Sequence, residues 1–289
     1  MKIIDRIASD TPTISFEIFP PKTTAGLTSV LRAADEIAAL SPSFISITYG
    51  AGGGRSRFTA DIAGELQKKS GIPVLAHLTC VTQSRESLLS TVAQYQSLGI
   101  ENILALRGDQ PKDGAPETDY LHATDLVYEL KKLGDFCIGG ACYPEGHIEC
   151  AHKSEDIRHL KEKVDAGAEF LTTQMFFDNN IYYNFLYRVR DIGITVPILP
   201  GIMPITTAKQ LGRSVEMSGT NVPERFRAIV DHFGDSPEAM KQAGIVYASE
   251  QIIDLLANGV KHIHVYSMNK PEVAAGILRN LQGILGGQE

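Results

Sequence analysis

Cysteine is scarce in this sequence, with four residues among 289, at positions 80, 137, 142 and 150. This content is too low for the disulfide framework of a small secreted domain. The first ten residues, MKIIDRIASD, lack the long apolar core and small-residue cleavage site of a secretory signal. No apolar run approaches the roughly 18 to 20 residues of a membrane-spanning helix. We therefore expect a cytoplasmic protein without a membrane span.

Positive charge is in deficit, since the formal net charge is −7 and the isoelectric point is about 5.6. This balance argues against a nucleic-acid or anionic-membrane surface. The hydrophobic content of 43% and charged content of 21% are typical of a soluble globular protein. The fingerprint G-x-G-x-x-G is absent, and no linker or low-complexity segment divides the chain. The sequence thus predicts a single domain over residues 1–289.

Short apolar or alternating segments predict eight β-strands, at 13–19, 44–49, 73–79, 103–106, 136–143, 170–176, 197–202 and 262–268. Amphipathic segments predict helices at 27–40, 57–70, 84–98, 121–133, 154–167, 180–192, 207–257 with breaks near Gly219 and Gly234, and 271–284. Eight strand–helix repeats predict a single (β/α)8 TIM barrel with extra helices between strands seven and eight. A doubly wound sheet is the alternative, but its usual Gly-rich turn after the first strand is replaced by PPKTT.

Polar side chains recur at the ends of the predicted strands. They are Glu17, Thr48, Tyr49, His77, Thr79, Arg107 to Asp109, Tyr143, His147, Gln174 and Tyr266. The C-terminal ends of barrel strands carry the active site in this architecture. Carboxylates, imidazoles and amides inside strands are costly unless they are paired or wet. The pattern therefore predicts a polar ligand pocket at this end of the barrel.

Eight segments of the chain, in order, resemble the methylenetetrahydrofolate reductases. They are SFEIFPPK (15–22), ITYGAGG (47–53), AHLTC (76–80), ALRGDQP (105–111), ACYPEGH (141–147), LKEKVDAGAEFLTTQMFFD (160–178), PILPGIMPI (197–205) and VYSMNK (265–270). The resemblance implies a (β/α)8 barrel that carries FAD. The length is that expected of a bacterial catalytic domain without the regulatory extension of eukaryotic members.

The resemblance implies catalytic roles for two carboxylates. Glu17 is expected to be the general acid that protonates N10 of 5,10-methylenetetrahydrofolate, through water, so that the ring opens to a 5-iminium cation able to accept hydride. Asp109 is expected to lie between flavin and folate and to stabilise that cation. The alternatives from the residues alone are a structural carboxylate bonded to a loop for Glu17, and an ion pair with Arg107 for Asp109.

The resemblance also implies ligand contacts. Gln174 is expected at the pterin edge, Tyr266 on the substrate side, and Lys270, where some relatives carry Arg, near the folate glutamate carboxylate. The implied FAD contacts are Thr48, His77, Leu106, Arg107, Gly108, Asp109, Ala141, Tyr143, His147, Asp156 and Lys163. Among these, Arg107 and Lys163 are expected to meet the pyrophosphate charge.

Several questions stay open at this stage. The aromatic residue that covers the nicotinamide in some relatives has no counterpart near residues 211–215, so the electron donor is NADH, NADPH or a partner electron-transfer protein. Cys142, His147, Cys150 and His152 do not have a standard zinc spacing, and we expect no metal site. We expect a homo-oligomer or a complex subunit. The rival functions are another FAD-containing barrel oxidoreductase, such as a proline-dehydrogenase-like protein, or a folate-binding complex subunit.

Overall fold

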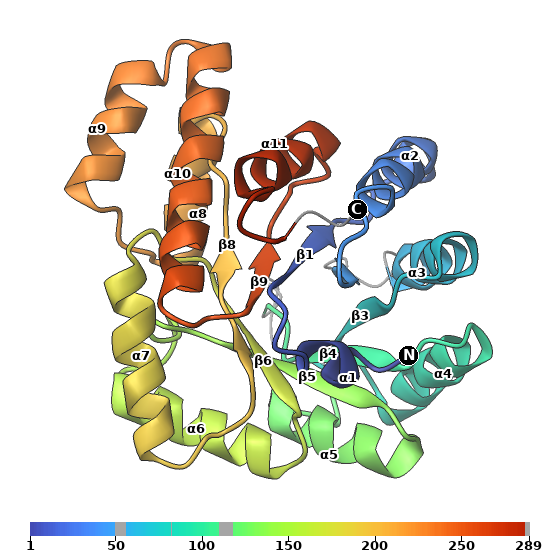
Figure 1. The fold of residues 1–289 in the computed structure, drawn as a ribbon. Coiled ribbons are helices and arrows are strands. Elements are labelled where there is room, and N and C mark those ends of the chain that lie inside the picture. Colours follow the sequence, from blue (N-terminus) through green and yellow to red (C-terminus); the bar gives the residue numbers. More distant parts are fainter. Residues whose placement is uncertain (50–55, 82, 110–117, 287–289) are drawn as a thin grey trace.

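The computed structural model describes residues 1–49, 56–81, 83–109 and 118–286, and in it a parallel sheet closes into a barrel surrounded by helices (Figure 1). The ends of two family-like segments, residues 50–53 and 110–111, lie outside the described residues. The strands are β1 Thr13–Ile18, β2 Ile45–Ile47, β3 Val74–Thr79, β4 Asn102–Leu106, β5 Cys137–Cys142, β6 Phe170–Thr173, β7 Ile198–Leu199, β8 Gly201–Ile202 and β9 His262–Val265. Their order in the sheet is β7-β6-β5-β4-β3-β2-β1-β9-β8, and all pairs are parallel.

Pro200 divides the predicted seventh strand into β7 and β8. Proline has no N–H to donate to a neighbouring strand, so the ladder is interrupted at this residue. Strand β7 pairs with β6 and β8 pairs with β9, while the N–H of His264 donates to the Pro200 carbonyl at 3.0 Å. The two short strands therefore occupy one position, and eight positions close the barrel. The predicted (β/α)8 fold is confirmed.

Helices follow the strands. They are α2 Leu27–Ala38, preceded by the 3-10 turn η1 Thr24–Gly26, α3 Ser56–Ser70, α4 Arg85–Ser97, α5 Ala123–Leu133, α6 Lys153–Asp165, α7 Asn179–Asp191, α8 Ala208–Ser218, α9 Glu224–Phe233, α10 Pro237–Ala257 and α11 Pro271–Leu281. Local chemistry explains several of the starts: Ser84 caps α4 by accepting from the N–H of Ser87, and proline opens α10 and α11.

Helices α8, α9 and α10 separate β8 from β9 and stand to one side of the barrel (Figure 1). Gly219 ends α8 in the left-handed conformation, with φ +66°, and Gly234 follows α9. The rings of Phe226 in α9 and Tyr247 in α10 stack with centroids 4.1 Å apart. This contact belongs to a second apolar cluster that joins the three helices to the loop after β8.

A short helix that the sequence did not predict, α1 Ile3–Ile7, precedes the first strand. Its two buried isoleucines belong to an apolar cluster with residues of the barrel interior, which are Phe44, Leu75, Leu104, Cys137, Phe170 and Leu199. The N–H of Ile3 donates to Oδ1 of Asn102, the first residue of β4, at 2.7 Å. Helix α1 therefore closes the N-terminal end of the barrel with apolar side chains.

Strand β1 places side chains alternately on its two faces. Ile14, Phe16 and Ile18 pack in the cluster that joins the sheet to the helices. The intervening residues, Ser15 and Glu17, face the barrel interior instead. The apolar interior at the N-terminal end thus gives way to a polar interior toward the C-terminal ends of the strands.

Candidate active site

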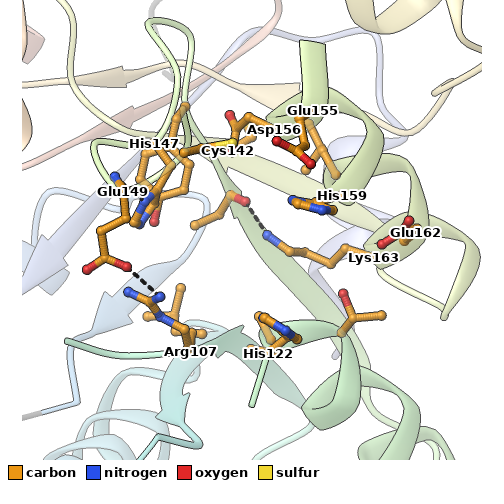
Figure 2. A pocket seen from close by; sticks show the side chains of 18 of the residues that line it. Arg107, His122, Cys142, His147, Glu149, Glu155, Asp156, His159, Glu162 and Lys163 are labelled. Carbon is orange, nitrogen blue, oxygen red and sulfur yellow. Dashed lines mark hydrogen bonds and ion pairs between the residues drawn. The ribbon is translucent and has the colours of Figure 1, made fainter. Parts of the chain in front are cut away.

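A cavity of about 640 Å³ lies between the ends of β4 and β5 and the helices α5 and α6 (Figure 2). Seven of the eleven residues expected to contact FAD line it, namely Leu106, Arg107, Ala141, Tyr143, His147, Asp156 and Lys163. Strands β4 and β5 are adjacent in the sheet, with Ala105 opposite Gly140, so their C-terminal ends meet here. Helix α6 follows β5 and returns Asp156 and Lys163 to the same space.

Two cations reach into this cavity from different elements (Figure 2). Nη1 of Arg107 lies 2.6 Å from Oε2 of Glu149, and the hydrogen bond to this carboxylate raises the pKa of Arg107. Nζ of Lys163 donates to the Ala141 carbonyl at 2.7 Å, and burial lowers the pKa of this ammonium. A Cβ atom at Gly140 would lie 2.8 Å from Cδ of Lys163, so glycine leaves the room that the lysine side chain occupies.

Burial shifts the neighbouring titratable groups toward their neutral forms. It raises the pKa of Tyr143 to about 12 and raises that of Asp156, and it lowers the pKa of His147. The rings of Tyr143 and His147 meet edge to face, with centroids 4.6 Å apart. This wall of the cavity therefore combines an aromatic surface with titratable groups beside the two cations.

A second polar group lies inside the barrel. Glu17 is 6% exposed, and its Oε2 lies 3.6 Å from Nε2 of His77, 3.8 Å from Nε2 of His264 and 3.4 Å from Oγ of Ser46. Within the described residues Nε2 of His77 has no hydrogen-bond partner, and burial lowers the pKa of this histidine to about 4. These contacts of Glu17 with described residues come from neighbouring strands rather than from a loop.

The residues expected on the substrate side make local contacts. Oε1 of Gln174 accepts from the N–H of Met175 at 3.0 Å, and the Tyr266 hydroxyl donates to the Thr173 carbonyl at 2.5 Å. Nζ of Lys270 donates to Oγ1 of Thr206 at 2.7 Å. Tyr266 adjoins the interior group, because its ring lies edge to face with that of His264 at 5.4 Å.

The other expected flavin contacts do not line the cavity. Asp109 is exposed, and among the described residues the ion pair of Arg107 is with Glu149 rather than with Asp109. The N–H of Thr48 donates to the Ile18 carbonyl at 3.0 Å, which places it at the end of β2. Gly108 has φ +89°, and a Cβ there would lie 3.0 Å from Cβ of Thr79, so both conformation and space require glycine.

Three polar residues beside these groups were not singled out from the sequence. Glu149 reaches Arg107 from the loop between β5 and α6, a pairing that no local pattern indicates. Ser15 and Ser46 contact His264. Serine inside a strand gives no functional signal by itself, although the alternation of β1 does place Ser15 on the face of Glu17.

Residues 211–215, where some relatives carry the aromatic residue that covers the nicotinamide, belong to a packed apolar cluster. Leu211 is buried in this cluster with Phe226 and Tyr247, and Val215 packs against it. Among the described residues, no three His, Cys, Asp or Glu side chains are grouped to hold a metal ion. None of the helices in the described part of the chain has the length and apolar character needed to cross a bilayer.

The fold and these two polar groups define a (β/α)8 barrel with its candidate active site at the C-terminal ends of the strands. The family model for methylenetetrahydrofolate reductase matches residues 2–282, and the chain belongs to this family.

Named relatives agree with this assignment. The 5,10-methylenetetrahydrofolate reductase of Escherichia coli (strain K12) is 36% identical over 269 residues, covering 93% of this chain and 90% of that protein. Methylenetetrahydrofolate reductase (NADH) 1 of Zea mays is 39% identical over 300 residues, covering 97% of this chain and 51% of that protein. The chain thus spans about half the length of the plant relatives that it matches.

Among solved structures, an uncharacterized protein from Clostridium thermocellum, described as binding two copies of 5-methyl-5,6,7,8-tetrahydrofolic acid, superposes with a TM-score of 0.67. It covers 97% of this chain and 98% of its own, at 14% identity. At this identity the likeness concerns the fold alone.

Proposed function

We propose that this protein reduces 5,10-methylenetetrahydrofolate to 5-methyltetrahydrofolate by ping-pong hydride transfer through FAD. Family membership supports the reaction. One structural observation supports FAD as the cofactor: seven of the residues expected to contact it line one cavity of about 640 Å³. The electron donor in this proposal is NAD(P)H or a partner redox protein, and the name of the Zea mays relative favours testing NADH first.

The chemistry of the cavity fits FAD. Its volume lies within the range of roughly 300 to 1,000 Å³ that small-molecule and cofactor sites occupy. Arg107 and Lys163 offer two cations to a pyrophosphate, and Leu106 and Ala141 offer apolar contact beside them. When bound, FAD would supply an acceptor for hydride from the donor and a source of hydride for the folate.

Glu17 is the acid in this proposal. Proton donation to N10 of the folate, through water, makes that nitrogen a better leaving group and opens the five-membered ring. Glu17 lies among strands with 6% of its surface exposed, and its Oε2 is 3.6 Å from Nε2 of His77, so its carboxyl group is held in a fixed place inside the barrel.

The remaining expected residues bind or stabilise. Asp109 would stabilise the iminium cation electrostatically, and Gln174 would hydrogen-bond the pterin edge. Tyr266 would flank the substrate. Lys270, which now donates to Thr206, would exchange that contact for the folate glutamate carboxylate.

Anaerobic stopped-flow absorbance of the flavin band tests the proposal directly. NADH, NADPH and methyltetrahydrofolate are mixed separately with the purified protein. Bleaching by methyltetrahydrofolate and by one nicotinamide would support a self-sufficient reductase, whereas bleaching by the folate alone would support a partner protein as donor. A protein without a flavin band, even after FAD is added, would overturn the proposal and leave a folate-binding subunit.

Replacing Glu17 with glutamine tests the assigned acid. Glutamine keeps the size of the side chain but cannot deliver a proton, so flavin reduction by the donor should remain normal. The folate half-reaction should slow by about 10²- to 10⁴-fold, the usual contribution of a general acid. Equal loss in both half-reactions would show that Glu17 does not have this role.

A further inference from the structure

The loop after β9 is fastened to the end of β1 by two of its side chains. The parallel ladder between β1 and β9 extends along β1 as far as Phe16. Beyond that residue, the Ser267 hydroxyl donates to the Glu17 carbonyl at 2.9 Å. The side-chain amide of Asn269 then forms two hydrogen bonds with the backbone of Phe19, each 2.8 Å long. Side chains of this loop therefore hold the segment of β1 that carries Glu17.

Asn269 uses both groups of its amide in this contact. The N–H of Phe19 donates to Oδ1 of Asn269, and Nδ2 of Asn269 donates to the Phe19 carbonyl. A carboxylate could only accept and an aliphatic side chain could do neither, so the contact requires an amide. Asn269 thus satisfies the donor and the acceptor of one residue, as a neighbouring strand would.

The backbone that carries Asn269 has an unusual conformation. The N–H of Lys270 donates to the Ser267 carbonyl at 3.1 Å, so residues 267–270 form a β-turn. Its two central residues, Met268 and Asn269, have φ +56° and +55°, the combination of a type I′ turn. Asparagine tolerates this left-handed region, but the Cβ atom of methionine disfavours it. The bonds from Ser267 and Asn269 to β1 stabilise the turn against that preference.

The same turn sets the position of Lys270. This residue is the N-cap of α11, where the partial positive charge of a helix N-terminus disfavours a cation. Its Nζ donates to Oγ1 of Thr206, in the loop after β8, at 2.7 Å. Helix stability therefore gives no reason for a lysine at this position, whereas a contact with a ligand carboxylate does.

We propose that Asn269 is a positioning residue for the folate half-reaction. It fixes the end of β1, which carries Glu17, relative to the turn that presents Lys270. In the proposed function these two groups act on separate parts of one folate, N10 and the glutamate carboxylate, so their separation must be kept. The inference rests on the proposed function for the roles of Glu17 and Lys270. The pairing of Asn269 with Phe19 is a property of the protein itself.

Hydrogen exchange of the Phe19 amide tests the pairing without turnover. Asn269→Gly removes the side-chain amide, and glycine adopts φ +55° without a steric penalty, so the turn is retained. The Phe19 amide should then exchange about 2- to 10-fold faster than in the wild type. Ser41→Gly is the matched control, because Ser41 also has φ +55° but lies between α2 and β2, at the opposite end of the barrel. It should leave the exchange of Phe19 unchanged.

Anaerobic stopped-flow absorbance of the flavin band tests the functional role. In Asn269→Gly, flavin reduction by the electron donor should keep the wild-type rate. Bleaching by saturating methyltetrahydrofolate should slow by about 10- to 100-fold, because Glu17 and Lys270 no longer keep a fixed separation. Ser267→Ala, which removes the bond to the Glu17 carbonyl, should slow the same half-reaction, and Ser41→Gly should slow neither.

Bleaching of Asn269→Gly by methyltetrahydrofolate at the wild-type rate would overturn the role of Asn269. An equal loss in both half-reactions would overturn it as well, because it would indicate a general effect on the fold. An unchanged exchange rate of the Phe19 amide would overturn the pairing on which the role depends. Failure of the proposed function is distinguished from these results, since the wild type itself would then not be bleached by methyltetrahydrofolate.

Discussion

Lys163 and Arg107 hold their positive charges in the cavity by different contacts. Arg107 is paired with a carboxylate, whereas Lys163 donates to a backbone carbonyl and forms no ion pair with the carboxylates that the structure describes. A pyrophosphate would therefore gain a charge-assisted hydrogen bond from Lys163 without first breaking an ion pair, a gain of about 1.5 to 3 kcal/mol.

Lys163→Met tests this role, because methionine keeps an unbranched side chain of similar length in the room beside Gly140. We expect FAD to bind about 10- to 100-fold more weakly, as measured by quenching of flavin fluorescence on the FAD-free protein. Lys161→Met, on the same helix, removes a cation that pairs with Asp165, and it should leave the affinity unchanged. Equal affinities in the two variants would remove Lys163 from the cofactor site.

The site residues differ in how far the sequence could predict them. Glu17 and Arg107 stand at strand ends within family-like segments, so both pattern and resemblance indicate them. Ser46 and Glu149 act through partners on other elements, and such pairings depend on the closed barrel rather than on sequence spacing.

At the scale of helices, α10 approaches the loop after β8 so closely that a side chain is excluded. A Cβ at Gly244 would lie 1.8 Å from the Ile205 carbonyl oxygen, so alanine must displace the helix from backbone that cannot turn aside. We expect Gly244→Ala to lower the free energy of unfolding by about 1 to 3 kcal/mol or more, as measured by urea denaturation.

Gly212 in α8 is the matched control, because this glycine is exposed and a Cβ added to it would meet no described atom within 4 Å. Gly212→Ala should therefore stabilise the protein by about 0.5 to 1 kcal/mol through helix propensity. A stabilised Gly244→Ala variant would contradict the close packing of α10 on this loop.

Hydrophobic periodicity predicted the order of strands and helices because each element is long enough to repeat its pattern. Helix α1 has five residues, little more than one turn, so no periodicity could reveal it. The apolar run through Pro200 suggested one strand, and only the missing N–H of proline explains its division into β7 and β8.

For the whole molecule, the neutral His77 links folding to pH. Its pKa is about 4 in the folded state and 6.5 for an exposed histidine, so the unfolded state binds a proton more readily. The contribution of His77 to the free energy of unfolding should fall by about 3 kcal/mol as the pH decreases from about 6.5 to about 4. Below that range the contribution of this one group should stay constant.

The free energy of unfolding, measured by denaturation at a series of pH values, tests this dependence. The free energy of unfolding of His77→Gln should depend less on pH between about 6.5 and 4 than that of the wild type. The difference between the two slopes should correspond to close to one proton taken up on unfolding. His147 and His262, whose pKa values burial also lowers, remain in both proteins and cancel in the comparison. Parallel curves for the two proteins would contradict a neutral buried His77.

The pairing of β1 with β9 has a consequence for synthesis on the ribosome. Ser15 and His264 are 249 positions apart, and at about 5 to 20 residues per second the second follows the first by roughly 10 to 50 seconds. During that time the open edge of β1 has no strand β9 to pair with. Glu17 likewise acquires His264 beside it only after that residue has been synthesised, so the interior polar contacts of Glu17 cannot be complete before nearly the whole chain has been made.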